Sequence, residues 1–317
     1  MTLAYVLGGL NDGSGLGLDL YEKYSRVRNS FAEMATWTGV DPRELIGVPL
    51  SAADSLNGLG QYRQAALVFA IADVLRDHGI EPSAVGGLSL GSFIGAALSG
   101  AVERSDLLSL LLRRREMPDP DPGERRQGIA LMLLEPQMRL GELCRDRPGL
   151  YPAVDMGPLA TENGRLGVIS GYRDALEALA AELPGETVNI IGDRDDAPHS
   201  PLQQPLADFL APHIAAMPFS DPRIPVSSCL EAKVLTTAGE IKDVFRRIIT
   251  SPVSAVHLQD GLQRTGTELG LVLGPAPADR FVHWPFPVVH VETTDDLTIA
   301  LESIMDIGID PLPVKRP

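Results

Sequence analysis

A serine with a glycine two residues to either side is the feature of this sequence that points most directly to chemistry. Residues 87–91 read Gly-Leu-Ser-Leu-Gly. This spacing is typical of a nucleophile elbow, in which a serine stands on a sharp strand-to-helix turn and the glycines relieve the crowding around it. Ser89 is therefore the candidate nucleophile. A glycine-rich turn whose serine only caps a helix is the simpler alternative, because the pattern is short.

The backbone amide that follows this serine would complete such a site. The N–H of Leu90 lies at the start of the expected helix, where the aligned peptide dipoles favour negative charge. An amide in that position stabilises the oxyanion that forms when a serine attacks a carbonyl group. We therefore expect Leu90 to supply one oxyanion donor.

A serine hydroxyl also needs a general base, and histidine is the usual one. The six histidines are His78, His199, His213, His257, His283 and His290. His199 differs from the others because it follows the acidic turn at 193–198, on a loop at the expected junction of two domains, where catalytic groups tend to lie. We expect His199 to be the base, with an ordinary loop histidine as the alternative.

The elements that must position these residues indicate an α/β fold. Short apolar runs at 3–7 and 84–88 are typical of buried strands, and they alternate with helical patterns. The helices are expected at 19–34, 61–78, 90–100 and 104–115. The proline-rich stretch 117–123 then interrupts all periodicity, and we interpret it as a linker.

The segment after this linker has a different order of elements. It reads strand, helix, strand, strand, helix, strand, which is the ferredoxin-like arrangement. The six elements are expected at 128–134, 136–144, 151–156, 165–170, 172–183 and 187–191. The sequence thus predicts a large α/β-hydrolase-like subdomain with a parallel sheet, formed by residues 1–122 and 198–317, and an inserted ferredoxin-like subdomain of residues 123–197.

Composition argues against several classes of function. The chain has 317 residues and a formal net charge of −15, which argues against nucleic acid or an anionic membrane as a partner. The longest uncharged run, 88–102, is too short and too rich in Gly and Ser to span a bilayer. The 2 cysteines suggest neither a disulfide framework nor a metal site, and the first residues resemble a strand and not a signal peptide. We therefore expect a cytoplasmic protein.

Several landmarks, in this order along the chain, resemble those of one enzyme family. They are a glycine-containing loop near the N-terminus, the elbow at Ser89, an arginine at position 114, the inserted segment, and the dipeptide Pro198-His199. Over roughly residues 1–275 the chain is similar to malonyl-CoA:acyl-carrier-protein transacylases and to the stand-alone, trans-acting acyltransferases of polyketide synthases. The resemblance implies that Ser89 is acylated and that His199 is its base.

The resemblance also implies roles for three further residues. The backbone N–H of Leu10 would be the second oxyanion donor. Residues 251–254 match an Asn-Pro-Val segment whose carbonyl group orients the histidine, a role that passes to Ser254. Arg114 matches the arginine that binds the free carboxylate of a malonyl group, which suits the planar guanidinium fork.

The departures from the family pattern concern the substrate. The first loop reads Gly-Gly-Leu-Asn at 8–11 instead of Pro-Gly-Gln-Gly. Leu88 replaces the usual histidine, Ser92 the usual glutamate, and Asp196 an aromatic or apolar residue. A buried carboxylate at Asp196 needs a cationic partner, either Arg194 or an ammonium group on the acyl substrate. We therefore expect Leu88, Ser92 and Asp196 to line the substrate site together with Arg114.

These observations predict an acyltransferase that works by ping-pong transfer. The acyl group would move from a thioester of CoA or of a carrier protein to Ser89, and then to the phosphopantetheine thiol of an acyl carrier protein, in polyketide biosynthesis. The departures favour an atypical acyl group, for example an aminoacyl or dipeptidyl unit, as in family members from macrolactam pathways. Arg114 favours the alternative, a malonyl-CoA:acyl-carrier-protein transacylase. No metal and no cofactor beyond the substrate's phosphopantetheine is expected.

A hydrolase is the alternative from another class. An editing thioesterase would use the same acyl-serine, because water and a thiol attack it in the same way. An α/β-hydrolase would need an acid and a late histidine, such as His283 or His290. The inserted segment and the position of His199 argue against that arrangement.

Overall fold

The computed structural model describes residues 2–10, 17–51, 54, 58–118, 123–160, 163–183, 187–192 and 194–306. Two expectations from the sequence fall partly or wholly outside these residues. One is the linker at 117–123, of which 119–122 are not described, and the other is that the proline-containing segment 311–317 forms a loose tail.

The larger sheet is built on strands that are buried on both faces. All residues of β1 (Leu3–Leu7) and β2 (Ala84–Gly87) are buried, as expected of parallel strands covered by helices on both sides. The strand order is β11-β10-β1-β2-β7-β8, and every neighbouring pair is parallel except β7 and β8. The other strands are β7 (Val226–Ser227), β8 (Val234–Leu235), β10 (Leu269–Leu273) and β11 (Val288–Val291).

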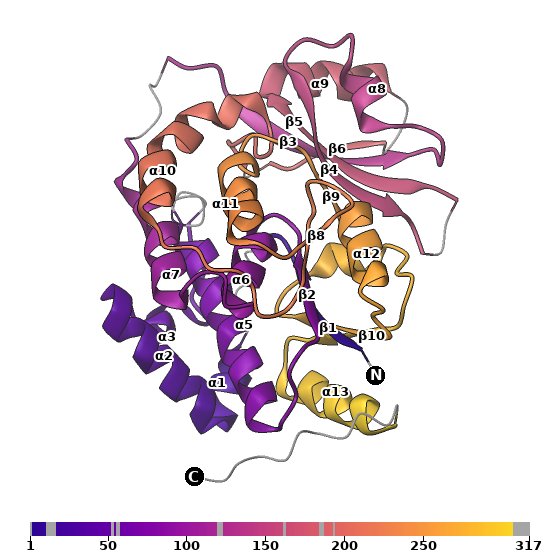
Figure 1. The fold of residues 1–317 in the computed structure, drawn as a ribbon. Coiled ribbons are helices and arrows are strands. Elements are labelled where there is room, and N and C mark those ends of the chain that lie inside the picture. Colours follow the sequence, from indigo (N-terminus) through magenta and orange to yellow (C-terminus); the bar gives the residue numbers. More distant parts are fainter. Residues whose placement is uncertain are drawn as a thin grey trace.

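Helices pack around this sheet (Figure 1). The long helix α5 (Leu59–Asp77) is buried along most of its length, and α6 (Leu90–Leu98) packs on β1 and β2 directly after the candidate elbow. The remaining helices of this part are α1 (Leu18–Lys23), α2 (Ser25–Thr38), α3 (Pro42–Leu45), α7 (Arg104–Arg113), α10 (Gln204–Ala216), α11 (Ala238–Arg247), α12 (Ala255–Arg264) and α13 (Thr294–Asp306). Among the described residues, no helix is both long and apolar enough to cross a membrane.

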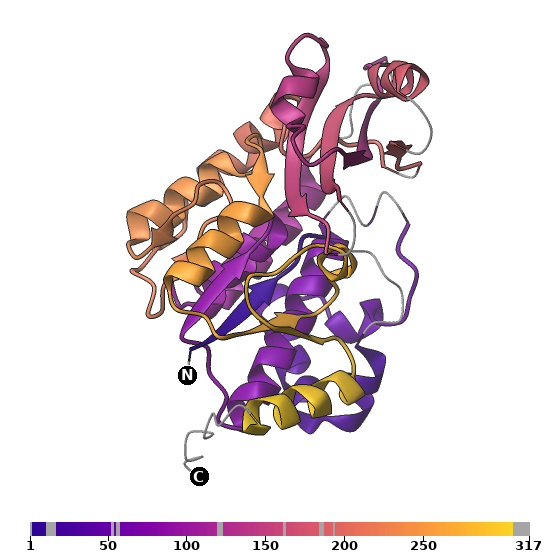
Figure 2. The same ribbon diagram turned by 90° about the vertical axis from the view of Figure 1, so that its right-hand side faces the viewer.

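The second sheet has the β-α-β-β-α-β order predicted from sequence. Its strands run in the order β6-β3-β5-β4-β9, and β3, β4, β5 and β6 pair antiparallel as in a ferredoxin-like sheet. Helices α8 and α9 pack on this sheet, which stands above the larger one (Figures 1 and 2). Its elements are β3 (Gln127–Leu134), α8 (Leu140–Cys144), β4 (Leu150–Pro158), β5 (Arg165–Tyr172), α9 (Arg173–Glu182), β6 (Val188–Ile190) and β9 (Val253–Ser254).

Two details of the elements differ from the sequence prediction. The helix expected at 19–34 is divided at Tyr24, whose extended backbone separates α1 from α2. The second sheet also takes a strand from outside residues 123–197, because β9 pairs in parallel with β4. The predicted α/β fold class with a ferredoxin-like subdomain is confirmed, while the domain boundaries stay a prediction.

The two sheets share apolar core, which holds their facing loops in place. Met156 and Leu166 belong to the second sheet, yet they are buried in the same hydrophobic cluster as the strands of the larger sheet. The hydroxyl of Ser170 on β5 donates to the carbonyl of Pro198 over 2.6 Å. The loop that carries His199 is therefore braced from the second sheet.

Candidate active site

Ser89 lies on a strained turn between β2 and α6. Its backbone has φ 55° and ψ −116°, a conformation that residues other than glycine rarely adopt. The two glycines are required by close packing: a Cβ at Gly87 would overlap the backbone of Gly91, and a Cβ at Gly91 would overlap the carbonyl of Leu7. Strand and helix can approach this closely only without side chains, so the turn presents the Ser89 hydroxyl away from the sheet.

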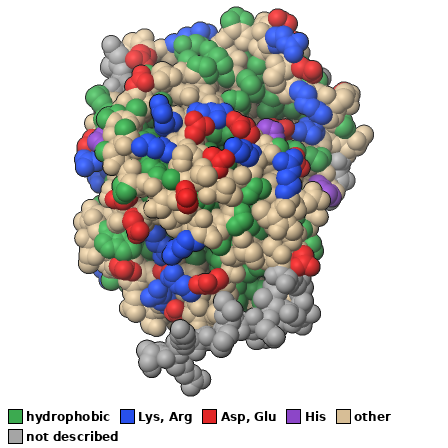
Figure 3. Space-filling model, viewed as in Figure 1, with side chains coloured by type: hydrophobic (Ala, Val, Ile, Leu, Met, Phe, Trp, Pro, Cys, Tyr) green, Lys and Arg blue, Asp and Glu red, His purple; other side chains and the backbone are tan. Residues whose placement is uncertain are grey.

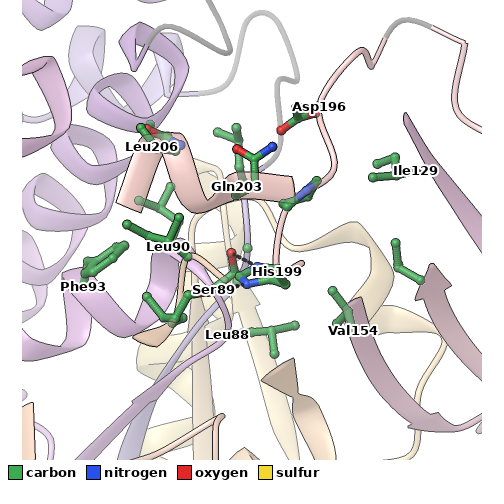
Figure 4. A pocket seen from close by; sticks show the side chains of 18 of the residues that line it. Leu88, Ser89, Leu90, Phe93, Ile129, Val154, Asp196, His199, Gln203 and Leu206 are labelled. Carbon is green, nitrogen blue, oxygen red and sulfur yellow. Dashed lines mark hydrogen bonds between the residues drawn. The ribbon is translucent and has the colours of Figure 1, made fainter. Parts of the chain in front are cut away.

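The structure brings Ser89 and His199 together across 110 positions of sequence. The Nε2 atom of His199 lies 2.7 Å from the Oγ atom of Ser89. The Nδ1 atom lies 2.7 Å from the carbonyl oxygen of Ile248. Because a carbonyl can only accept, Nδ1 carries the proton and Nε2 accepts from the serine hydroxyl. Figure 4 shows this pair in the middle of the pocket.

Several hydrogen bonds fix the loop around His199. The backbone of His199 has φ 57°, and its N–H donates to the carbonyl of Ile249. The side chain of Gln127 on β3 accepts from the amide of Ala197 and from the side chain of Gln203. These contacts hold the histidine in a backbone conformation that an unsupported loop would leave.

The expectation that Ser254 orients this histidine is wrong. Ser254 caps α12: its hydroxyl accepts from the amide of His257, and its own amide donates to the carbonyl of Cys229. The carbonyl that holds the imidazole belongs instead to Ile248, which directly follows α11. The last carbonyl groups of a helix have no partner within the helix, so one of them is available to the ring.

Burial controls the protonation of His199. Burial lowers the pKa of its imidazole below the ordinary value of 6.5, while the hydrogen bond to Ile248 and the carboxylate of Asp196 act in the opposite direction. The neutral form is therefore favoured at neutral pH. A neutral imidazole with a free Nε2 lone pair is the form that can accept a proton from Ser89.

The two expected oxyanion donors line the same pocket as Ser89. Leu90 is the first residue of α6, and neither its backbone amide nor that of Leu10 donates a hydrogen bond to another described residue. Gly9 lies beside the serine, since a Cβ built on it would be 3.8 Å from the Cβ of Ser89. The segment that carries Leu10 is thus placed close to the reacting hydroxyl.

The pocket is a mostly apolar cavity of about 320 Å³. One wall comes from α6, with Leu90 and Phe93, and the opposite wall from the second sheet, with Ile129 and Val154 (Figure 4). Leu206 extends the apolar lining. The volume lies at the lower end of the roughly 300–1,000 Å³ typical of small-molecule pockets.

Three charged side chains line one region of the cavity. Arg194 forms a bidentate ion pair with Asp196, at 2.8 and 2.9 Å, so the expected cationic partner of Asp196 is within the chain. Arg114 lines the cavity, and its guanidinium forms no hydrogen bond with any described residue. Burial lowers the pKa of its guanidinium, and the carboxylate of Asp196 partly offsets this effect.

Two further residues, Leu88 and Ser92, were expected to contact the substrate. Leu88 lines the pocket. The expectation for Ser92 is wrong: its hydroxyl is buried, donates to the carbonyl of Gly87 over 2.7 Å and lies 3.1 Å from the sulfur of Cys229. Ser92 follows Ser89 by one turn of α6 and faces the protein interior.

Among the residues that no sequence motif identified, four have polar groups that matter at this site: Gln127, Gln203, Ile248 and Asp279. Ile248 directly follows the end of α11, and the end of a predicted helix was a usable signal because the last carbonyl groups of a helix lack partners within it. Asp279 is buried near the end of the α/β region, where no sequence motif marks it. Within the described residues, no group of three or more His, Cys, Asp or Glu side chains could hold a metal ion.

Comparisons with known proteins agree with the resemblance seen in the sequence. No family model matches the chain. It is 24% identical to the malonyl CoA-acyl carrier protein transacylase of Escherichia coli O157:H7 over 271 residues, 82% of this chain and 84% of that protein. It is 26% identical to a non-reducing polyketide synthase of Menisporopsis theobromae over 276 residues, 83% of this chain and 12% of that protein.

Solved structures show the same fold. A type II polyketide synthase acyl-carrier protein in complex with its malonyl-transacylase matches with a TM-score of 0.82 at 21% identity, covering 96% of this chain and 100% of that one. A Synechocystis malonyl-CoA:ACP transacylase matches with a TM-score of 0.81 at 21% identity, covering 94% of this chain and 100% of that one. The relatives and structural neighbours thus include malonyl-CoA:acyl-carrier-protein transacylases, as the resemblance predicts.

Proposed function

We propose that this protein is an acyltransferase that forms an acyl-serine on Ser89. The observation that carries the proposal is the hydrogen bond from the Ser89 hydroxyl to Nε2 of a neutral His199, whose tautomer is set by the carbonyl of Ile248. His199 takes the hydroxyl proton as the serine oxygen attacks the thioester carbonyl. The C–S bond then breaks, and the leaving thiolate receives that proton from the imidazole.

The amides of Leu10 and Leu90 stabilise the tetrahedral oxyanion in this scheme. Both lie at the cavity and both lack another described acceptor. A donor aimed at the developing charge acts strongly in an apolar, water-poor site, where the loss of one donor costs about 3 kcal/mol in the barrier. The positive end of α6 adds to this effect at Leu90.

A phosphopantetheine thiol of an acyl carrier protein is the proposed acceptor. Its sulfur attacks the acyl-serine carbonyl, His199 removes the thiol proton, and the serine oxygen leaves and is reprotonated. Support comes from the relatives, which are carrier-protein transacylases, and from the neighbouring structure of such an enzyme with its carrier protein. The donor thioester is carried by CoA or by a second carrier protein.

The lining of the cavity favours an acyl group with more apolar surface than malonyl. Its walls are mostly apolar, which suits a carbon chain better than a short dicarboxylate. Asp196 stands close enough to Arg114 to affect its pKa, so this cation already has a negative neighbour. An atypical acyl group, such as an aminoacyl or dipeptidyl unit, fits these observations. The guanidinium of Arg114 has no hydrogen-bond partner among the described residues, which favours malonyl as the second candidate.

Intact-mass spectrometry tests the proposal. The protein is incubated with a panel of acyl-pantetheine thioesters that includes malonyl, neutral acyl and aminoacyl groups. We expect an acyl adduct on the wild type and on Ser92→Ala, the matched control from the same helix, and none on Ser89→Ala. An adduct that persists in Ser89→Ala rejects the proposed nucleophile.

The fate of the adduct separates transfer from hydrolysis. A carrier protein that bears a free phosphopantetheine thiol is added to the acylated enzyme. Transfer predicts that the acyl mass appears on the carrier protein. Release of free acid, at a rate that the carrier protein does not change, would instead identify an editing thioesterase.

A further inference from the structure

One carboxyl group at the cavity has no role in the proposed reaction. Asp279 lies in the short helical turn η3 (Pro277–Arg280), lines the cavity and is 7% exposed. No described residue forms a hydrogen bond or an ion pair with its carboxyl group. Its backbone is fully engaged, since its amide donates to the carbonyl of Ala276 and its carbonyl accepts from the indole of Trp284. The position of Asp279 is thus fixed while its carboxyl group stays without a partner.

The turn that carries Asp279 lies near the reacting serine. A Cβ on Gly8 would come within 2.8 Å of the Cβ of Ala276, so the loop before η3 packs directly on the first loop of the chain. The next residue, Gly9, contacts Ser89. On its other side η3 is joined to the second sheet, where the amide of Ala160 donates to the carbonyl of Phe281. Asp279 therefore stands at the junction of the two sheets, on the side of the first loop.

Among the described residues, no side chain supplies a counter-charge to Asp279. Burial raises the pKa of this carboxyl group to about 7, and no charged side chain contributes to the shift. Arg114 and Arg194 line the same cavity, but neither contributes to the pKa shift of Asp279. An unpaired carboxylate in an apolar site costs several kcal/mol, and a bound cation removes that cost.

The two acidic residues of the cavity differ in what they leave free. Asp196 is saturated by the bidentate pair with Arg194, whereas Asp279 has both oxygens available. A neutral N–H donor, such as a pantetheine amide, could donate to a neutral acceptor, for example a backbone carbonyl or an Asn side chain. Such an acceptor does not carry the cost of a buried charge. A carboxylate is the better partner for a cationic donor.

We propose that Asp279 binds an ammonium group on the acyl chain of the substrate, so that the transferred unit is aminoacyl. This inference rests on the proposed acyl transfer through Ser89. Asp279, an acidic side chain, would recognise a cationic acyl group, whereas Arg114, a basic side chain, would recognise the anionic malonyl group.

Matched thioesters that differ only in the ammonium group test this inference. Glycyl, β-alanyl and γ-aminobutyryl thioesters of pantetheine are compared with acetyl, propionyl and butyryl thioesters, and kcat/KM for acylation of Ser89 is measured. Chain length is varied so that the ammonium can reach Asp279. We expect the wild type to prefer at least one aminoacyl thioester over its counterpart, and Asp279→Asn to reduce kcat/KM for it by about 100-fold. The uncharged counterpart should change by less than about threefold.

Controls distinguish the possible failures. Asp195→Asn removes an exposed carboxylate from the opposite loop and should leave the preference unchanged. An equal loss for both members of a pair would show that Asp279 supports the fold or binds the pantetheine arm, and would overturn the inference. So would a wild type that acylates readily but shows no preference for any aminoacyl thioester. No adduct from any thioester would instead reject the proposed function itself.

Discussion

Two residues of this protein have a strained backbone, and both belong to the candidate dyad. Within the described residues, Ser89 and His199 are the only residues other than glycine with a positive φ. Such a conformation costs of order 1–3 kcal/mol at each position. It persists because close packing at Gly87 and Gly91 holds the serine, while the carbonyls of two successive isoleucines hold the histidine. The strain thus accompanies the alignment of a hydroxyl with a base.

The lowered pKa of His199 predicts the pH dependence of acylation. The neutral imidazole is the active form, so the rate falls only when pH drops through a pKa that lies below 6.5. More than half of the maximal acylation rate should therefore remain at pH 6.5. Single-turnover acylation with an acetyl or propionyl thioester measures this profile, because these substrates do not titrate.

The pH profile of acylation could also contradict the assignment of His199 as the base. A midpoint above pH 6.5 would mean that the base is more basic than free histidine, which burial does not allow. His199→Ala should lose this titration together with most of the activity, by about 10²–10⁴-fold. Its folding is checked by circular dichroism, so that a collapsed variant is not mistaken for an inactive one.

At the scale of elements, the contact between β2 and α6 decides whether the elbow forms. A methyl group at Gly87 would overlap backbone atoms of Gly91 and Ser92, which cannot rotate away as a side chain would. We expect Gly87→Ala to lose about 3 kcal/mol of stability or more, with a Tm lower by roughly 5 °C or more. Differential scanning calorimetry measures this change.

Gly95 provides the matched control on the same helix. A Cβ there would lie 3.5 Å from the nearest atom, a Val85 methyl carbon, which is ordinary van der Waals contact. Alanine also favours a helix interior by about 1 kcal/mol over glycine. Gly95→Ala should therefore leave the Tm unchanged or raise it. Equal losses in the two variants would contradict the packing argument.

At the scale of the whole molecule, we expect the two sheets to unfold as one cooperative unit. Met156 is buried in the core of the larger sheet, and β9 joins the second sheet from outside its main segment. Both tryptophans, Trp37 and Trp284, lie outside residues 123–197. Urea unfolding followed by tryptophan fluorescence and by far-ultraviolet circular dichroism should therefore give coincident transitions.

Met156→Ala sharpens this prediction. It removes buried volume from the shared core and should cost about 2–5 kcal/mol, with both transitions moving together. Leu133→Ala, at a side chain that is 44% exposed on the same sheet, is the control and should change stability little. A second circular-dichroism transition at higher urea would show that the second sheet unfolds separately.

The surface charge also belongs to this scale. The chain carries a formal net charge of −15. Acidic and basic side chains are nevertheless interspersed on the face drawn in Figure 3. Arg125 and Arg247, for example, pair with neighbouring carboxylates. An acidic carrier protein would thus meet a mixed surface and not a uniformly repulsive one.

The sequence by itself determined the features that depend on local pattern. Alternating strand and helix signals predicted both sheets, and glycine spacing identified Ser89, because sterics at a turn act over only a few residues. The loop position of His199 was also readable. Asp196 replaces an aromatic or apolar residue of the family, and the sequence already offered Arg194 as its ion-pair partner, because Arg194 is only two residues away.

Only the tertiary structure decided which distant groups meet. The sequence pattern assigned the carbonyl that holds the imidazole to Ser254, whereas the path of α11 brings the carbonyl of Ile248 to the ring instead. Ser92 was turned to the interior by its place on α6, while Asp279 was brought to the cavity by packing of its loop on Gly8. These outcomes depend on distances between segments far apart in sequence. No local pattern encodes such distances, because they arise only when the two sheets share one core.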